Sequence, residues 1–514
     1  MNQLTGLKTV LSRISISAAL IIIMANISIL AIRENIPDEK TKIRKPNILF
    51  IWTDEQQPNT MSVYGNHKIH TPNLNKFANE STVFKNAYVS QPVCTPSRAT
   101  VMTGLWPHQS SLVRNNIPLP QNIKCFPEIV NDPDYKTGYF GKWHLGDEVF
   151  SQHGFEEWVS IEDHYRKYYM PGRDRNQMSD YWQFLKENGF TPRPLDNEFN
   201  RDFAAMLPHE FSKPKFLEMK TIDFLERNQN EPFILYVNFL EPHMPFFGPF
   251  NDEYDPSEID LPFNFNDPIE DNEPLRYRLK REHLKKNGRE GFSLKTEEDW
   301  RRLIANYWGL VTEVDLSVGA ILNSLEDLGL ADNTIVVFTS DHGDMMGAHR
   351  LLGKGVMYEE AIQIPWLIRI PHMGRNQQII ENRVSHIDLV PTLLDLMNVE
   401  ADKDLPGQSL VPLINGKSVE EDHVFIQWNY LNKTGIKTTD DAQPLQKAYF
   451  RAVISPHGWK LSLSDNDKSQ LFDLNNDPYE TKNLFYSGNH QDIINKLTEK
   501  IHKWQDSIND KVKI

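Results

Sequence analysis

The amino-acid sequence predicts an α/β fold, in which a large mixed, mostly parallel β-sheet is flanked by helices and followed by a small C-terminal α+β subdomain. Three observations lead to this fold class. Near-continuous apolar runs at 47–53, 233–239 and 334–338 each end in polar residues, which is typical of strands buried on both faces. Apolar residues recur at helical spacing over 300–325, as in a helix that packs on a core. From about residue 415 the chain changes to short strand-like segments and a final helix.

Length and composition indicate a folded protein and exclude some classes of function. The chain has 514 residues, of which 39% are hydrophobic, so it is long enough for a large packed domain and a smaller one. Its formal net charge of −15 argues against nucleic-acid binding, and no nucleic-acid partner is expected. Cys94 and Cys125 are the only cysteines, which excludes a disulfide framework.

The N-terminal segment predicts export. Lys8 and Arg13 precede an uncharged run at 14–32, and a positive flank before an apolar core is typical of a secretory signal peptide. We therefore expect an exported, periplasmic protein, although the run is also long enough for a retained membrane anchor. The expected segments are a signal peptide or anchor at 1–32, a linker at 33–45, a catalytic domain at 46–414 and an antiparallel-sheet subdomain at 415–514.

Acidic residues follow the first predicted strand. The apolar run at 47–53 ends in Asp54 and Glu55. Open α/β sheets bind their ligands outside the carboxyl ends of the strands, so these two side chains lie where a functional site is expected. The common alternative is an acidic turn without a function.

Cys94 lies at a predicted helix start. A strand at 84–89 leads into its loop, and Pro96 and Ser97 are typical of a first helical turn. Cys94 would then lie at the positively charged end of the helix, where anions such as sulfate bind. Arg98, one turn further along, can reach back toward it. Alternatively, Cys94 is a small buried side chain beside an ordinary helix.

Lys142 and His144 form a second candidate group. They alternate on a segment that we expect to be extended, which would place both side chains on one face, and imidazole carries protons near neutral pH. The following region, 150–230, is rich in aromatic and charged residues. The candidates to line a substrate groove there are Tyr165, Arg166, Tyr168 and Arg173, and an ordinary surface insertion is the alternative.

Further polar residues follow the two later strands. His243 comes shortly after the apolar run at 233–239, and Asp341 and His342 come after the run at 334–338. Lys354 follows within the next loop. The polar segment at 250–298, rich in Pro and Asp, is expected to be a surface loop.

Together these motifs resemble the type I sulfatases of the alkaline phosphatase superfamily, including bacterial polysaccharide sulfatases. The resemblance covers nearly all of 46–485. It implies that Cys94 is oxidised after translation to formylglycine, and that a formylglycine-generating or sulfatase-maturating enzyme is a partner. The motifs that carry it are Cys94-Thr95-Pro96-Ser97-Arg98 with Thr103-Gly104, Gly141-Lys142-Trp143-His144-Leu145-Gly146, Pro242-His243-Met244-Pro245 and Asp341-His342-Gly343.

The resemblance also implies a cation site and a set of catalytic residues. One Ca²⁺ per chain is expected, because oxygen-rich ligation favours calcium over zinc. Glu55 stands where many family members have Asp. The implied metal ligands are Asp54, Glu55, Cys94 as formylglycine, Asp341 and His342. The implied catalytic residues are Cys94, Arg98, Lys142, His144, His243 and Lys354.

In the implied reaction, a hydroxyl of the hydrated aldehyde at residue 94 attacks sulfur. His243 or Lys354 protonates the leaving alcohol, and His144 removes a proton in the step that releases sulfate. Lys142 and Lys354 neutralise the sulfate oxygens.

The expected function is hydrolysis of sulfate esters in a sulfated polysaccharide or its oligosaccharides. An algal polysaccharide such as ulvan is the expected substrate, since export and an aromatic insertion suit a polysaccharide. The alternatives are a phosphodiesterase or phosphonate monoester hydrolase of the same superfamily, and a binding protein whose site has decayed. Relative rates on sulfate and phosphate esters distinguish the first alternative, and metal-dependent turnover would exclude the second.

Overall fold

The computed structural model describes residues 44–514, except residue 269, 418–422 and 430–446. The predicted signal peptide or anchor at 1–32, and nearly all of the predicted linker at 33–45, lie outside the described residues. In the part of the chain that is described, no helix combines the length and the apolar character that a membrane span needs.

The large sheet confirms the predicted α/β class. It consists of β1 (Asn47–Thr53), β2 (Thr82–Tyr88), β3 (Lys136–Gly141), β4 (Glu157–Val159), β5 (Phe233–Asn238), β6 (Thr334–Ser340), β7 (Gln363–Arg369) and β8 (Gln378–Ser385). The spatial order is β4-β3-β5-β1-β6-β7-β2-β8. Neighbouring strands are parallel, except that β7 runs antiparallel to both β6 and β2. The sheet is therefore mixed and mostly parallel, as predicted.

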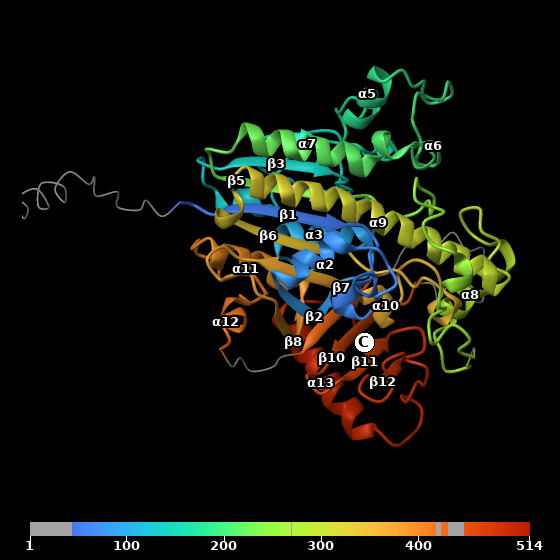
Figure 1. The fold of residues 1–514 in the computed structure, drawn as a ribbon. Helices are drawn as coiled ribbons and strands as arrows, with labels where there is room; N and C mark the ends of the chain where they lie inside the picture. Colours follow the sequence, from blue (N-terminus) through green and yellow to red (C-terminus); the bar gives the residue numbers. More distant parts are fainter. Residues whose placement is uncertain (1–43, 269, 418–422, 430–446) are drawn as a thin grey trace, which may run out of the picture. The chain divides into compact units, whose positions relative to one another are not determined.

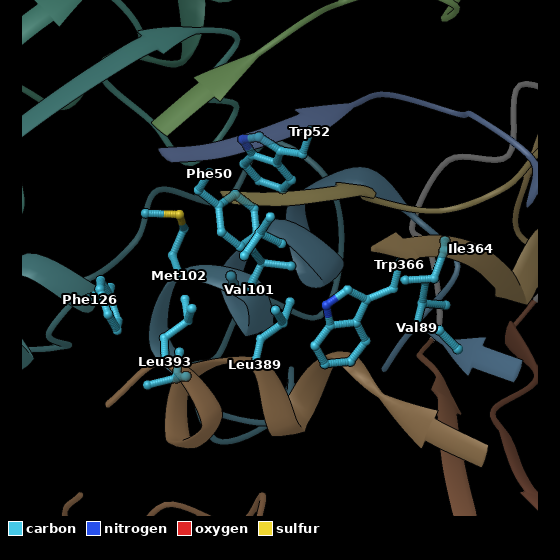
Figure 2. Close-up of a cluster of buried hydrophobic side chains, with 14 of the residues drawn as sticks. Phe50, Trp52, Val89, Val101, Met102, Phe126, Ile364, Trp366, Leu389 and Leu393 are labelled. Atoms are coloured by element: carbon cyan, nitrogen blue, oxygen red, sulfur yellow. The ribbon is translucent and has the colours of Figure 1, made fainter. Parts of the chain in front are cut away.

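Helices cover both faces of this sheet, because the alternate side chains of each strand point to opposite faces. In β1, Phe50 and Trp52 belong to one apolar cluster and Leu49 and Ile51 to another. The first cluster is packed by α3 (Cys94–Thr103), α4 (Phe126–Val130) and α11 (Leu389–Leu396), as Figure 2 shows for Val101, Met102, Phe126, Leu389 and Leu393. The second is packed by α2 (Pro72–Asn79), α7 (Lys213–Arg227) and α9 (Glu297–Asp327).

The long helix α9 confirms the helical pattern read from the sequence. Thr296 is its N-cap, and the Thr296 hydroxyl accepts a hydrogen bond from the backbone N–H of Asp299. Its buried face includes Leu303, Val314 and Leu325. In Figure 1, α7 and α9 lie along the strands of the sheet.

The C-terminal segment forms the small antiparallel sheet that was predicted. Its strands are β9 (Val424–Trp428), β10 (Phe450–Ile454), β11 (Trp459–Ser464) and β12 (Gln470–Asp473), in the order β12-β11-β10-β9. Apolar residues of α13 (Gln491–Ser507) pack on it. The described part of the chain also contains the α-helices α5 (Asp180–Glu187), α6 (Arg201–Ala205), α8 (Leu275–Asn287), α10 (Glu359–Ile362) and α12 (Val411–Ile414).

The prediction of a surface loop at 250–298 was wrong. This segment contains the helix α8, and Tyr277, Arg281 and Leu284 of that helix are buried. Leu284 joins an apolar cluster with residues of α9. The many Pro and Asp residues around α8 masked a helix whose own sequence holds good helix formers such as Leu, Lys and Arg.

The order of the strands brings the polar motifs together. The strands β3, β5, β1 and β6 are neighbours and run parallel, so their carboxyl ends meet at one edge of the sheet. Each of the four is followed by one of the motifs identified in the sequence. The candidate site therefore lies at this edge of the sheet.

Candidate active site

Cys94 is the first residue of α3, as the sequence predicted. Its side chain is buried, and its Sγ atom lies 3.3 Å from Nε2 of His342 and 3.9 Å from Oδ1 of Asp54. Burial, reinforced by the nearby Asp54 carboxylate, raises the pKa of the Cys94 thiol. An unmodified thiol here is therefore protonated at neutral pH and is a poor nucleophile.

Arg98 holds together the two acids that follow β1 and β6. Its Nη2 donates to Oδ2 of Asp54 over 2.8 Å, and its Nε donates to Oδ2 of Asp341 over 2.9 Å. All three side chains are fully buried. Burial alone would raise the pKa of Asp54, but Lys142, His243 and Arg98 hold it well below its usual range. Asp54 is therefore a carboxylate at neutral pH.

Four of the five predicted metal ligands form one cluster. Asp54, Glu55, Cys94 and His342 each offer a ligand atom, and these atoms lie within 4.8 Å of one another. The fifth, Asp341, is adjacent: its Oδ1 lies 3.6 Å from Nε2 of His342 and accepts the backbone N–H of Glu55 over 3.2 Å. Glu55 has a left-handed backbone conformation, with φ of 69°, which is uncommon for this residue type.

The donor set fits a divalent cation. Oε2 of Glu55 is buried and accepts no hydrogen bond from the described residues, and an unsatisfied buried carboxylate oxygen is costly unless a cation binds it. Apart from the sulfur of Cys94, the cluster combines carboxylates with one imidazole. Such ligation suits hard cations better than thiolate-preferring ones.

Two lysines and His243 surround the same acids. Nζ of Lys142 pairs with Oδ2 of Asp54, and Nζ of Lys354 pairs with Oε1 of Glu55. Nε2 of His243 lies 3.1 Å from the same Glu55 oxygen, while its Nδ1 lies 2.7 Å from the carbonyl oxygen of Met244. Burial lowers the pKa of Lys354 to about 8. The site thus places several positive charges around Cys94.

The expected extended segment from Lys142 to His144 was wrong. The strand β3 ends at Gly141, and His144 has a left-handed φ of 57°, so the chain turns sharply after Lys142. Both side chains nevertheless reach the site region. The backbone oxygen of His144 accepts a hydrogen bond from the hydroxyl of Thr95, which follows Cys94 in the chain, over 2.8 Å.

The His144 ring is held in one tautomer. Its Nε2 lies 3.0 Å from Oδ1 of Asn116, and an amide oxygen only accepts hydrogen bonds, so Nε2 carries the proton. Its Nδ1 is buried and has no hydrogen-bond partner among the described residues. Burial and Lys142 lower the pKa of His144 well below its usual value. The neutral ring therefore presents a free acceptor nitrogen.

Several residues of the site were not identified from the sequence. Asn238 ends β5 and its side-chain oxygen accepts from Nη1 of Arg98 over 2.9 Å. Glu148 accepts the backbone N–H groups of Trp143 and His144, each over 2.7 Å, and so fixes the turn. The position of Asn238, a polar residue at the end of an apolar strand, was a usable signal. Glu148 carried no such signal.

Two residues of the aromatic region at 150–230 contact the histidines of the site. Tyr165 is buried and stacks on the His144 ring, with 4.2 Å between ring centroids. Arg201 binds the Tyr165 hydroxyl over 2.9 Å and lies 3.4 Å from Nδ1 of His243. Arg166, a candidate groove residue, instead pairs with Glu198 over 2.7 Å.

Comparison with known proteins gives two family matches. A family model described as sulfatase matches residues 46–399, and a model described as N-sulphoglucosamine sulphohydrolase, C-terminal, matches residues 347–507. Among curated proteins, the chain is 29% identical over 482 residues to an uncharacterized sulfatase of Escherichia coli, covering 91% of this chain and 88% of that protein. It is 28% identical over 489 residues to the ulvan-active sulfatase of Formosa agariphila, covering 93% of this chain and 83% of that protein.

The fold also matches solved structures. A phosphonate monoester hydrolase from Silicibacter pomeroyi superimposes with a TM-score of 0.75 at 23% identity, covering 90% of this chain and 95% of that one. At this level of identity the likeness concerns the fold alone.

Proposed function

The chain belongs to the sulfatase family, whose members hydrolyse sulfate esters, and on that premise we propose that it removes sulfate groups from a sulfated polysaccharide or its oligosaccharides. The observation that carries the proposal is the position of Cys94. Its side chain lies at the N-terminus of α3, within 3.9 Å of both Asp54 and His342. A helix N-terminus and the cations around it favour an anionic substrate.

The nucleophile is proposed to arise from Cys94 by oxidation to formylglycine, which is a general feature of this family. When formed, the hydrated aldehyde supplies a hydroxyl group that attacks sulfur. Arg98 keeps the carboxylates of Asp54 and Asp341 in place on the neighbouring strand ends. Lys142 and Lys354 supply fixed positive charge for the sulfate oxygens. The proposed partner is the formylglycine-generating or sulfatase-maturating enzyme.

The cation is proposed to be Ca²⁺. The residues that would hold it are Asp54, Glu55, Asp341 and His342, together with the modified residue 94. Bound there, it would supply positive charge beside the nucleophile. Calcium is favoured over zinc because most of the donors are carboxylate oxygens.

We propose different proton-transfer roles for His144 and Lys354. The free Nδ1 of His144 is an acceptor, so this ring is the proposed base. Nδ1 of His243 lies 2.7 Å from the carbonyl oxygen of Met244, and its Nε2 lies 3.1 Å from Oε1 of Glu55, so both ring nitrogens face acceptors and a neutral ring can donate to only one of them. Lys354 keeps three N–H donors and is therefore favoured over His243 as the group that protonates the leaving alcohol.

The proposed substrate is ulvan or a similar algal polysaccharide. Support comes from the relative in Formosa agariphila that is named ulvan-active, which this chain matches over 93% of its length. The signal peptide predicted from the sequence agrees with action outside the cytoplasm. Export to the periplasm is likewise proposed.

The experiment is to measure sulfate release from sulfated polysaccharides and their oligosaccharides. The protein is produced together with a formylglycine-generating enzyme, and Cys94→Ala serves as the inactive control. A phosphodiester and a phosphonate monoester are tested in parallel. We expect sulfate release from an ulvan fragment. Cleavage of the phosphorus esters without any sulfate release would reject the proposed function.

A further inference from the structure

A group of three cationic side chains lies next to the proposed catalytic residues and has no part in the mechanism above. Arg276 and Lys280 belong to α8, and Arg289 follows that helix closely. All three come from the segment that was expected to be a surface loop. We refer to Arg276, Lys280 and Arg289 as the basic cluster.

Each member contacts the chain beside a proposed catalytic residue. Nζ of Lys280 donates a hydrogen bond to the backbone oxygen of Lys354 over 2.7 Å. Arg276 packs against Gly355, where an added Cβ would lie 3.1 Å from its Nη2 atom. On the other side, Nη2 of Arg289 lies 3.2 Å from Sδ of Met244, the residue after His243. The basic cluster therefore borders both Lys354 and His243.

The positive charge of this cluster is poorly compensated. Within the described residues, neither Arg276 nor Lys280 forms an ion pair, and Arg289 has one weak pair, in which its Nε lies 3.9 Å from Oε1 of Glu290. Two further carboxylates act on the cluster without pairing with it: Asp467 on Arg276, and Asp344 on Lys280 and Arg289. Neighbouring Arg281 differs, because it pairs with Glu273 over 2.8 Å. An arginine or lysine that is shielded from water without a counter-charge is costly.

Two further observations favour the binding of an anion at this cluster. Cζ of Arg276 lies over the Trp428 ring, 3.8 Å from its centroid, and the Nη1 atom of Arg276 is buried with no hydrogen-bond partner among the described residues. Burial, with repulsion from Arg289 and Arg276, lowers the pKa of Lys280 to about 7, opposed only by Asp344. A bound anion would satisfy the free donor and relieve this repulsion.

We propose that Arg276, Lys280 and Arg289 bind a second anionic group of the substrate, a carboxylate or a further sulfate, next to the sulfate ester that is hydrolysed. This inference rests on the proposed function, and it adds that the substrate is polyanionic. Guanidinium groups suit either anion, because their forked donors bind two oxygens at once. The cluster would then select sugars that carry a second charge near the scissile ester.

The test compares substrates that differ in charge. The variants are Lys280→Met and Arg289→Met, and Lys286→Met, an exposed lysine of the same helix, is the matched control. The substrates are 4-nitrophenyl sulfate, a sulfated oligosaccharide with a uronate, its carboxyl-reduced form, and a disulfated oligosaccharide without uronate. For both cluster variants, we expect kcat/KM on the dianionic substrates to fall at least tenfold more than on 4-nitrophenyl sulfate, mainly through KM.

The substrate arms identify the anion. If the cluster binds the carboxylate, the additional fall in kcat/KM disappears with the carboxyl-reduced oligosaccharide. If the cluster binds a sulfate, the additional fall in kcat/KM appears with the disulfated oligosaccharide. Equal losses on all substrates would overturn the proposal, because they would mean that Lys280 only supports the Lys354 loop. Unchanged kinetics in both variants would also overturn it.

Failure of the proposed function remains distinguishable. If the wild-type protein releases no sulfate from any substrate, the proposed function is rejected. Calorimetric measurement of the binding of the same oligosaccharides then shows whether the basic cluster binds an anion. At least tenfold weaker binding of the dianionic sugars by the variants supports an anion site. Equal binding by wild type and variants overturns it.

Discussion

Nε2 of His342 lies 3.3 Å from Sγ of Cys94, although 248 residues separate them in the chain. His342 follows β6, while Cys94 begins the helix that β2 leads into. Because the cation donors and the residue to be modified converge in this way, changes at either position should affect chemistry more than folding.

Replacing Cys94 with Ala should abolish turnover and preserve the fold. The residue is small and buried, so the loss of stability should stay below about 2 kcal/mol, while sulfate release should fall about 10³-fold or more. The measurements are initial rates and thermal unfolding. Cys125→Ala is the matched control, since it removes the other buried cysteine and should keep activity. Comparable activity of Cys94→Ala and wild type would reject the nucleophile.

Arg98→Met should destabilise the protein strongly. The substitution leaves the buried carboxylates of Asp54 and Asp341 without the cation that bridges them, and such a loss typically costs about 3–5 kcal/mol. Denaturant unfolding measures it. The double variant Arg98→Met/Asp341→Asn should recover part of the loss, because Asp54 still pairs with Lys142 and the Asp341 charge that Arg98 offset is gone. A double variant no more stable than Arg98→Met would contradict this explanation.

Glu55→Gln should weaken cation binding. It removes the charge of a buried carboxylate that has an unsatisfied oxygen in the ligand cluster. At a hundredfold excess over Kd, added Ca²⁺ should stabilise the folded wild-type protein by about 2.7 kcal/mol and so raise its Tm. The Tm of the variant should rise much less. Elemental analysis gives the bound metal directly. Asp344→Asn, a buried acid outside the ligand cluster, is the control and should retain the metal.

Asn116→Ala should slow turnover without preventing binding. Asn116 holds the proton of His144 on Nε2, so its loss allows the unreactive tautomer. We expect kcat to fall about 10- to 100-fold with little change in KM. Asn116→Gln, which keeps an amide oxygen, should recover part of the rate. A change confined to KM would instead place Asn116 in substrate binding.

Acid should destabilise the protein in part through Glu162. Burial would raise the pKa of this carboxyl, but Arg201 and Lys213 hold it well below the usual value. The pKa of Glu in an unfolded chain is about 4.3. As the pH falls, the unfolded chain therefore binds this proton before the folded protein does, and stability is lost below about pH 4.

The corresponding measurement is the free energy of unfolding of wild type and Glu162→Gln from pH 7 to pH 3. The variant should be less stable at pH 7, and the difference should shrink as pH falls. Glu187→Gln, at an exposed position, should follow the wild type throughout. A difference that stays constant with pH would show that Glu162 does not titrate in this window.

Local patterns predicted much of this fold and many residues of the candidate site. Apolar runs identified β1, β5 and β6, and polar residues at their ends identified Asp54 and Asp341. The helical spacing of apolar residues and the capping residue Thr296 identified α9. Predictions failed where local signals conflict: the chain turns after Lys142, and α8 lies among residues that favour loops. Arg201 was missed because a single arginine in a region rich in aromatic and charged residues carries no signal.

The sequence by itself determined the fold class, the sulfatase motifs and the residues that end each strand. These depend on the order of side chains along a short stretch, which one chain displays directly. Only the tertiary structure decided which groups meet: Arg98 between Asp54 and Asp341, Asn116 on His144, and Lys280 beside Lys354. The physical reason is that strand order, loop conformation and helix packing set these distances, and they are determined by burial across the whole chain.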